Sequence, residues 1–359
     1  MLTLEEVQLD NNRADTLGGG LYMDSGELVM LGGSLDYNQG YHGGGAYLDD
    51  LDGAILDGPR VSNNRAYHGG GLVAIAGAGH SIDVLDAEIT ANRAYESGGG
   101  VLAISRDATA AIRLDECQLV RNHASRQGGG LATSTQAVLS EVSVSRSIFE
   151  QNSAHTGGGM VGTGTIQRST FTANLASFGA GLATIAPYSY GPIWPPEDLY
   201  AGAPARVENS TFYRNSAYYT AGGLYADEPT EVLHTTFFAN SATSTAATIF
   251  GAGYVQMRSS IVAALSEPAI PHCDVPVSVG YNVATDIWCL AVSSDVLTFH
   301  PAGLLTYGNH GGPTPTIELS PTSHAIDAAD PATCPPIDQR GFPRPAGEGC
   351  DSGAYELQP

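Results

Sequence analysis

Lysine is absent from this 359-residue sequence, so all 15 basic residues are arginine, and 37 acidic residues bring the formal net charge to −22. That excess of negative charge argues against nucleic acid as a partner, because its phosphates would be repelled. It would also repel an anionic polysaccharide unless calcium bridged the two. No run of 18 apolar residues is present, which excludes a membrane-spanning helix.

Helical periodicity and proline are also scarce. No amphipathic stretch of helical period extends beyond about two turns. Only one proline, Pro59, precedes residue 187, whereas nineteen follow it. No secretory signal is visible at Met1, and residues 2–9 already alternate like a strand, so we expect a leader to lie upstream. The regular part of the chain is therefore expected in its first half, with loops concentrated in the second.

The sequence contains instead one motif that occurs eight times. It consists of an apolar residue, two variable residues, asparagine, a short polar stretch, a triplet of small residues and an apolar pair. The asparagines are Asn12, Asn38, Asn64, Asn92, Asn122, Asn152, Asn174 and Asn215, with a degenerate ninth at Asn240. Most triplets are three glycines, as at residues 98–100. A period of about 20 to 50 residues is typical of a solenoid.

Each repeat holds about three short alternating runs, which indicate strands that cannot bury their apolar faces alone. Stacked repeats would form parallel sheets around one interior. The predicted fold is therefore all-β: a right-handed single-stranded parallel β-helix with a loop-rich C-terminal cap. The residue three before each asparagine is apolar in every copy, from Leu9 to Phe237, and should face that interior. The asparagine amides should form a hydrogen-bonded ladder, and asparagine also tolerates the left-handed backbone of a turn.

The repeat signature over residues 1–265 resembles that of the chlamydial polymorphic outer-membrane proteins. These belong to the wider group of bacterial right-handed parallel β-helix surface proteins. The resemblance implies the pectin-lyase-like solenoid architecture and a place at the bacterial surface.

The tail resembles a second family, the C-terminal module called choice-of-anchor Q, found on secreted and surface β-helix proteins of bacteria. The blocks that carry the resemblance are Gly308–Thr316, Ser323–Asp327, Asp338–Gly341 and Cys350–Glu356, and they stand in the order of that module. His324 replaces the usual proline, and Ser352 replaces the usual isoleucine. The resemblance implies that the acids and Arg340 of these blocks hold a loop-rich cap together. We divide the chain accordingly into repeats over residues 1–265, with an insertion at about 187–205, and a disulfide-bonded segment over residues 266–359.

Four of the five cysteines lie in this tail, namely Cys273, Cys289, Cys334 and Cys350. Four cysteines allow three pairings. The two equal separations of 16 residues favour Cys273 with Cys289 and Cys334 with Cys350. Disulfides require an oxidising compartment, which indicates export. A zinc site would need closer spacing, such as Cys-x-x-Cys, and Cys117 is expected to be a small core residue.

Two columns of the repeat carry candidate ligand-binding residues. The first column lies three residues after the repeat asparagines and contains Tyr41, Tyr67 and Tyr95. The second column lies one residue after the asparagines and contains Arg65 and Arg93. In stacked coils the rings would form a ladder with a spacing of about 4.8 Å beside a track of guanidinium groups. Rings with arginine forks suit a sugar or peptide ligand. Alternatively, the tyrosines only pack on one another along the rod.

The widest gap between asparagines, from Asn174 to Asn215, marks an insertion. Its centre, residues 187–200, places Tyr188, Tyr190, Trp194 and Tyr200 among prolines. Insertions in repeat proteins often form the binding face, so these four aromatics are further candidate ligand-binding residues. The alternative is a loop that shields an irregular coil.

Motifs of catalysis are missing. The sequence has no serine nucleophile elbow, no HExxH and no phosphate loop, so we assign no catalytic residue and no metal ligand. Calcium is the one cofactor considered, at the acids Asp49, Asp50, Asp52 and Asp57, where a solvated turn is the simpler interpretation. Paired acids on neighbouring coils would leave no local motif. A polysaccharide lyase or glycoside hydrolase of the pectin-lyase-like superfamily is therefore the alternative function.

We predict a non-catalytic protein that is secreted or displayed at the cell surface, with an adhesive, structural or glycan-binding role. Its expected partner is an extracellular glycan or a host or matrix surface. The sequence leaves the oligomeric state open.

Overall fold

The computed structural model describes residues 1–135, 141–185, 204–251, 254–266, 270–274 and 277–359. The predicted fold class, an all-β parallel β-helix with a loop-rich C-terminal segment, is confirmed. Within the described residues the coil strands all pair in parallel, and the regular helical structure is one 3-10 turn, η1 (Ile287–Cys289). The chain divides into a first unit, Met1–Thr165 with Ile185–Pro204, and a second unit, Ile166–Thr184 with Ala205–Pro359.

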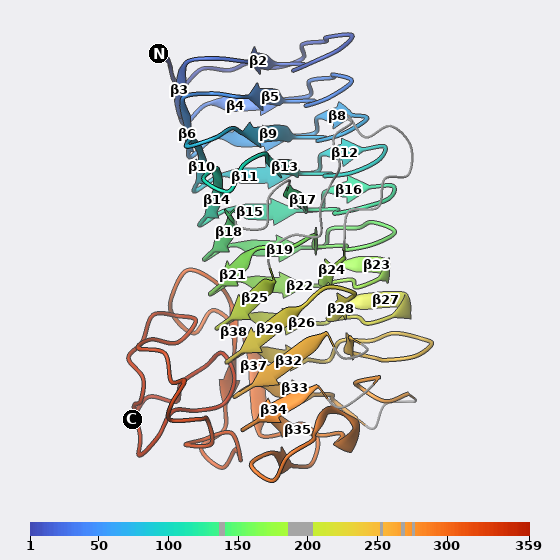
Figure 1. The fold of residues 1–359 in the computed structure, drawn as a ribbon, viewed down its shortest axis with the longest axis vertical. Helices are drawn as coiled ribbons and strands as arrows, with labels where there is room; N and C mark the ends of the chain where they lie inside the picture. The colour runs from blue at the N-terminus through green and yellow to red at the C-terminus, as the bar shows by residue number, and fades with distance from the viewer. Residues whose placement is uncertain (136–140, 186–203, 252–253, 267–269, 275–276) are drawn as a thin grey trace. The chain divides into compact units, whose positions relative to one another are not determined.

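In the first unit each coil contributes short strands to three sheets (Figure 1). The first sheet contains β1 (Leu2–Glu5), β3 (Glu27–Leu31), β6 (Gly53–Asp57), β10 (Ser81–Leu85), β14 (Ala111–Asp115) and β18 (Glu141–Ser145). The second contains β4 (Ser34–Asp36), β7 (Arg60–Ser62), β11 (Glu88–Thr90), β15 (Gln118–Val120) and β19 (Ile148–Glu150). The third contains β2 (Leu21–Met23), β5 (Ala46–Asp49), β9 (Leu72–Ala76), β13 (Val101–Ser105), β17 (Leu131–Thr135) and β20 (Met160–Val161).

The apolar column of the repeat forms the centre of this unit. Ile89 of β11 pairs with Val61 on one side and Leu119 on the other, so equivalent residues of successive coils lie directly above one another. From Leu35 to Phe149 every member of the column is fully buried. Burial of such a side chain stabilises the fold by about 1.5 to 3 kcal/mol.

The asparagines of the repeat form a buried ladder along the coils. The backbone N–H of Asn92 donates to Oδ1 of Asn122 at 3.0 Å, and the Asn92 side-chain amide donates to the carbonyl of Val61 at 2.8 Å. The left-handed backbone angles fall one position earlier than expected, at the residue before each asparagine, such as Ala91 and Arg121. The asparagine side chain therefore serves the ladder, while its neighbour makes the turn.

The second unit repeats this arrangement. Its first sheet contains β21 (Thr165–Gln167), β25 (Ala205–Glu208), β29 (Thr230–Leu233), β32 (Val255–Arg258) and β34 (Ser278–Gly280). Its second contains β22 (Thr170–Thr172), β26 (Thr211–Tyr213), β30 (Thr236–Phe238), β33 (Ile261–Ala263), β35 (Val283–Ala284) and β36 (Val296–Leu297). Its third contains β24 (Leu182–Thr184), β28 (Leu224–Ala226) and β31 (Ile249–Phe250), and a two-stranded sheet joins β23 (Leu175–Phe178) to β27 (Ser216–Thr220).

Phenylalanine fills the core column of the second unit. The rings of Phe171, Phe212 and Phe237 are buried and stacked, with 4.7 Å between successive centroids. The asparagine ladder is also present in this unit, where the backbone N–H of Asn174 donates to Oδ1 of Asn215 at 3.0 Å. Stacked aromatic rings add packing energy beyond the area that they bury.

The C-terminal tail lies along the sides of the coils of the second unit. Its antiparallel pair, β37 (Leu304–Gly308) and β38 (Thr316–Leu319), packs its apolar side chains against Phe238, Ile261 and Val283. Gln339 of the tail binds the coils through its side-chain amide. The amide nitrogen donates to the Thr170 hydroxyl at 2.8 Å, and the amide oxygen accepts from the Thr211 hydroxyl at 2.6 Å. Each of these threonines lies on a different coil, so one tail residue ties two coils together.

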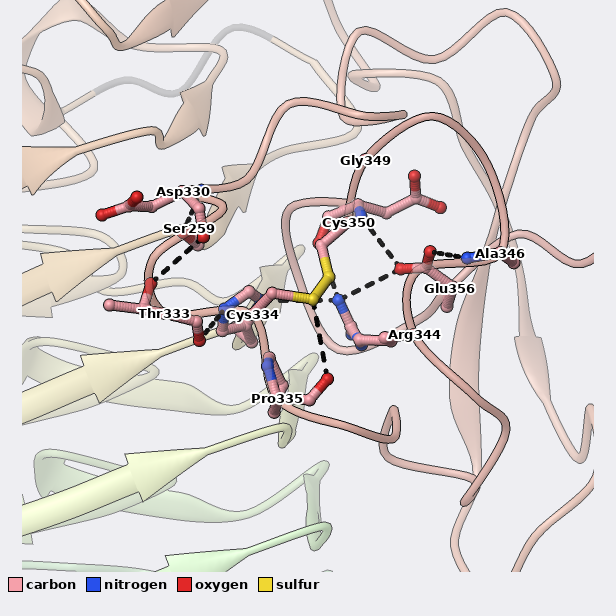
Figure 2. The surroundings of a disulfide bond; sticks show 12 residues. Ser259, Asp330, Thr333, Cys334, Pro335, Arg344, Ala346, Gly349, Cys350 and Glu356 are labelled. Carbon is pink, nitrogen blue, oxygen red and sulfur yellow. Dashed lines mark hydrogen bonds and ion pairs between the residues drawn. A yellow bond between two sulfur atoms is a disulfide. The ribbon is translucent and has the colours of Figure 1, made fainter.

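The structure joins Cys273 to Cys289 and Cys334 to Cys350, with Cα atoms 5.1 and 6.0 Å apart. The pairing predicted from the equal spacings is therefore supported. Figure 2 shows the second disulfide beside the buried side chains of Arg344 and Glu356. Cys117, the remaining cysteine, is buried in the first unit. The predicted domain division at residue 265 stays a prediction, since the second unit holds both coils and tail.

Candidate ligand-binding face

The candidate site of the first unit lies on the corner of the coils between the asparagine and the glycine triplet. Three short strands form this corner: β8 (Arg65–Ala66), β12 (Arg93–Ala94) and β16 (His123–Ala124). Side chains alternate there, so that Ala94 and Glu96 are buried while Arg93 and Tyr95 are exposed. We call the outward side chains of Tyr41, Tyr67, Tyr95, Arg65 and Arg93 the corner face.

The three tyrosines of the corner face lie one above another. The ring centroids of Tyr41 and Tyr67 are 5.0 Å apart with an angle of 5° between the planes, and those of Tyr67 and Tyr95 are 5.2 Å apart. Tyr41 is 51% exposed and Tyr95 is 63% exposed. The inner faces of the rings are occupied by stacking, so a ligand would meet ring edges and hydroxyl groups.

Arg65 and Arg93 form the neighbouring column, two residues before the tyrosines. They are direct partners in the parallel pairing of β8 and β12, and both are exposed. Successive outward residues on one strand lie about 6 to 7 Å apart, so the guanidinium and tyrosine columns run side by side. The corner face therefore presents a guanidinium group and a phenolic hydroxyl together on the coils of Tyr67 and Tyr95.

Buried polar side chains support the tyrosine ladder from beneath. His42 and His68 stack with centroids 5.3 Å apart, and their rings meet the edges of Tyr41 and Tyr67. The hydroxyl of Tyr67 donates to Glu96 at 3.0 Å, and Glu96 also pairs with Arg126. These contacts fix the orientation of the rings before any ligand arrives.

Acid is expected to weaken the first unit through this histidine pair. Burial, and secondarily the neighbouring His42, lowers the pKa of His68 from 6.5 to about 4. Because the folded-state pKa lies below the unfolded one, the unfolded chain takes up a proton first as the pH falls. The contribution is fully present above pH 6.5 and is lost by about pH 4, which lowers the free energy of unfolding by up to about 3 kcal/mol.

Denaturant unfolding at about pH 7.5 and about pH 5 measures this effect. The variant His68→Phe keeps an aromatic ring without a titrating nitrogen, so its stability should depend less on pH than that of the unmodified chain. His234 and His272 of the second unit are also buried, with pKa values lowered to about 3 and about 4, and they titrate in both proteins. An equal pH dependence in the two proteins would show that His68 does not carry the effect, and would contradict the prediction.

One acid of the cluster considered for calcium, Asp49, has internal partners. Asp49 binds Arg106 at 2.6 Å and accepts a hydrogen bond from Tyr47 at 3.2 Å. Among the described residues, no group of three or more His, Cys, Asp or Glu side chains is arranged to hold a metal ion. Calcium binding stays a prediction that the experiments below can test.

The aromatic residues predicted in the insertion, Tyr188, Tyr190, Trp194 and Tyr200, lie outside the described residues. A second group of rings, in the second unit, was not predicted. Phe178 stacks on Tyr219 with centroids 5.4 Å apart, and Tyr225 stacks on Phe250 at 5.1 Å. Tyr218 meets the ring of Tyr219 edge-on, with centroids 4.7 Å apart. It stands three residues after Asn215, at the tyrosine position of the repeat, whereas the other rings fall where the repeat is degenerate.

Within the described residues, no helix is both long enough and apolar enough to cross a bilayer. A comparison with protein-family models found no matching family, and a search of curated proteins found no significant match.

Proposed function

We propose that this chain is a non-catalytic extracellular or surface protein that binds an extended glycan along the corner face. The observation that carries the proposal is the ladder of tyrosine rings, two of them more than half exposed, beside Arg65 and Arg93, which are direct partners on neighbouring strands. Sugar hydroxyls pair well with guanidinium forks and with the phenolic hydroxyls that stand at the edges of the stacked rings.

The repeat of the protein favours a ligand that also repeats. Tyrosine recurs on three successive coils and arginine on two of them, with the strand spacing of about 4.8 Å between equivalent groups. A linear polymer lying along the coils would make the same contact several times, and weak contacts would add up without large ordering costs. The alternative of a single small ligand does not use this periodicity.

Rigidity of the corner face supports binding. The backbone of each corner is held by the asparagine ladder, and the rings are held by His42, His68 and Glu96. Little side-chain freedom remains to be lost on binding, which improves affinity for a given set of contacts. The disulfides of the second unit are compatible with an oxidising, extracellular environment.

A glycan array with and without calcium, paired with a polysaccharide depolymerisation screen, tests the proposal. We expect binding without product formation. The double variant Tyr41→Ser/Tyr95→Ser should bind at least about tenfold more weakly, because two exposed rings are removed. The matched control is Tyr37→Ser, since Tyr37 lies on the same coil as Tyr41, is 61% exposed and stands outside the ladder.

Four other outcomes would change or extend the conclusion. Product formation would replace the proposal by a polysaccharide lyase or glycoside hydrolase. No binding on the array would favour a structural role without a glycan ligand. Binding that is lost on trimming Tyr190 and Trp194, but kept in the corner-face variant, would transfer the site to the insertion. Binding that requires calcium would establish the predicted cofactor.

A further inference from the structure

The arginine pair of the corner face belongs to a longer aligned column. Parallel pairing places Arg13 opposite Gln39, Gln39 opposite Arg65, Arg65 opposite Arg93, and Arg93 opposite His123. All are outward positions, and the three arginines are exposed. We call these five residues the arginine column.

The arginines of this column lack the partners that most other arginines have. Nine of the fifteen arginines form ion pairs with Asp or Glu, namely Arg60, Arg106, Arg113, Arg126, Arg146, Arg206, Arg258, Arg340 and Arg344. Among the described residues, Arg13, Arg65 and Arg93 form none, although acids outnumber arginines 37 to 15 in the chain. Three guanidinium groups without an ion pair among the described residues therefore lie in one column of an acidic protein.

The arginine column has an energetic cost. Like charges that face each other directly on neighbouring strands repel, and Arg65 and Arg93 are direct partners. Glu96, a buried acid on the same coil as Arg93, is engaged by Arg126 at 3.0 Å and by the Tyr67 hydroxyl. At the first coil Asp15 takes the position that the tyrosines hold on later coils, so Arg13 has an acidic neighbour on the outward face. The uncompensated charge is thus concentrated at Arg65 and Arg93.

We infer that the glycan bound by the corner face is an anionic polysaccharide, whose carboxylate or sulfate groups lie on Arg65 and Arg93 while its sugar rings lie along the tyrosine ladder. This inference rests on the proposed function and names the class of its ligand. Arginine forks bind carboxylate and sulfate oxygens with two parallel hydrogen bonds, and a bound anion would relieve the repulsion between the two guanidinium groups. The net charge of the whole chain opposes such a ligand at long range, but salt screens that repulsion beyond about 10 Å.

Dextran and dextran sulfate provide a matched pair of probes, since they share one backbone and differ in charge. Affinities are measured by calorimetry at low and at physiological ionic strength. We expect dextran sulfate to bind at least about tenfold more tightly than dextran, with an affinity that falls as salt is added. The variant Arg65→Gln/Arg93→Gln should lose about tenfold in affinity for dextran sulfate and nothing in thermal stability, because both side chains are exposed and repel each other.

The control is Arg113→Gln/Arg206→Gln, which removes the same charge from two exposed arginines that have carboxylate partners. It should bind dextran sulfate within about twofold of the unmodified chain, because the removed charges lie outside the corner face. An equal loss in both double variants would show that bulk charge alone matters, and would overturn the inference. Polyglutamate bound as tightly as dextran sulfate would overturn it as well, because an acidic peptide would then serve equally.

The array separates this inference from the proposed function. Neutral glycans that bind at the tyrosines while dextran sulfate binds no more tightly than dextran would leave the proposed function standing and the inference refuted. Absence of binding to every neutral and anionic glycan would refute both.

Discussion

Replacing Gly99 with alanine is expected to destabilise the first unit by about 4 kcal/mol, although the change adds a single methyl group. A Cβ atom at this position would lie 2.3 Å from the carbonyl oxygen of Gly129 and 2.6 Å from backbone atoms of His123. Both obstacles are backbone of the next coil, which cannot rotate away as a side chain could. The two coils would have to separate, and the hydrogen bond from Gly99 N–H to the Gly128 carbonyl would weaken.

Gly53→Ala is the matched control. Gly53 lies in β6 of the same unit, and an added Cβ meets nothing within 4 Å. We expect that variant to be as stable as the unmodified chain or more stable by about 0.5 kcal/mol, since glycine in a strand has excess freedom when unfolded. Denaturant midpoints of the two variants measure the difference. If Gly99→Ala stays within about 1 kcal/mol of Gly53→Ala, the close contact between coils is not rigid.

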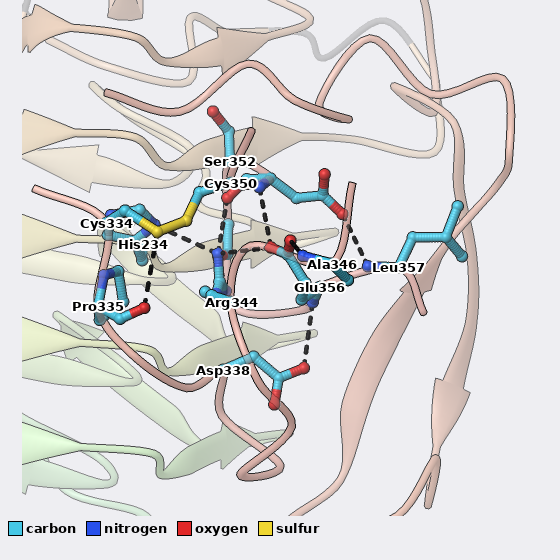
Figure 3. A network of polar contacts seen from close by, with 12 residues as sticks. His234, Cys334, Pro335, Asp338, Arg344, Ala346, Cys350, Ser352, Glu356 and Leu357 are labelled. Atoms are coloured by element: carbon cyan, nitrogen blue, oxygen red, sulfur yellow. Dashed lines mark hydrogen bonds and ion pairs between the residues drawn. A yellow bond between two sulfur atoms is a disulfide. The ribbon is translucent and has the colours of Figure 1, made fainter. Parts of the chain in front are cut away.

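Arg344→Met is expected to destabilise the second unit by about 4 kcal/mol, because it leaves the carboxylate of Glu356 buried without its cation. The two side chains are almost completely buried and lie 3.4 Å apart. Arg344 also donates to the carbonyls of Asp351 and Gly353, each at 2.7 Å, and these oxygens would lose their partner. Figure 3 shows this network, with Arg344 between His234 and Glu356.

A double-mutant cycle separates the ion pair from the other contacts. Glu356→Gln removes the negative charge and keeps an acceptor oxygen for only one of the two backbone N–H groups, those of Ala346 and Asp351, that donate to separate Glu356 oxygens. The lost acceptor is common to the single and double variants, so its cost cancels in the cycle. The double variant Arg344→Met/Glu356→Gln should be clearly more stable than the sum of the single changes implies, by about 1 to 3 kcal/mol. Additive effects would show that the two charges do not interact, and that the hydrogen bonds of Arg344 alone hold the tail.

The coil interior could be predicted from the sequence because the spacing of a repeat shows which residues of successive coils are paired. Equal positions in successive copies must lie above one another, so the apolar residues from Leu35 to Phe149 had to form one buried column, and the tyrosines had to stand in line. Equal separations likewise favoured the pairing of Cys334 with Cys350. The position of the left-handed turn residue was misplaced by one, because asparagine tolerates that backbone so well that it concealed the role of Ala91 and Arg121.

The contacts of the tail and the side-chain contacts of the corner face could not be predicted from the repeat. Gln339 contacts Thr170, 169 residues away, and no periodicity links the two. The stacking of His42 on His68 depends on which side chains turn inward at the corner. That no described acid forms an ion pair with Arg65 or Arg93 depends on neighbours from several coils. Such features arise from tertiary packing, which a single sequence indicates only where its residues recur at a fixed period.

The tail changes how the second unit can come apart. A solenoid whose coils touch only their neighbours unravels one coil at a time, from whichever end is weaker. Here Gln339 ties the coil of Thr170 to that of Thr211, and the backbone N–H of Ala354 adds the coil of Thr236. Releasing any one of these coils requires the tail to detach from the others. The tail therefore makes a series of separate local openings into a single cooperative transition, and gives a one-dimensional stack the all-or-none behaviour of a globular domain.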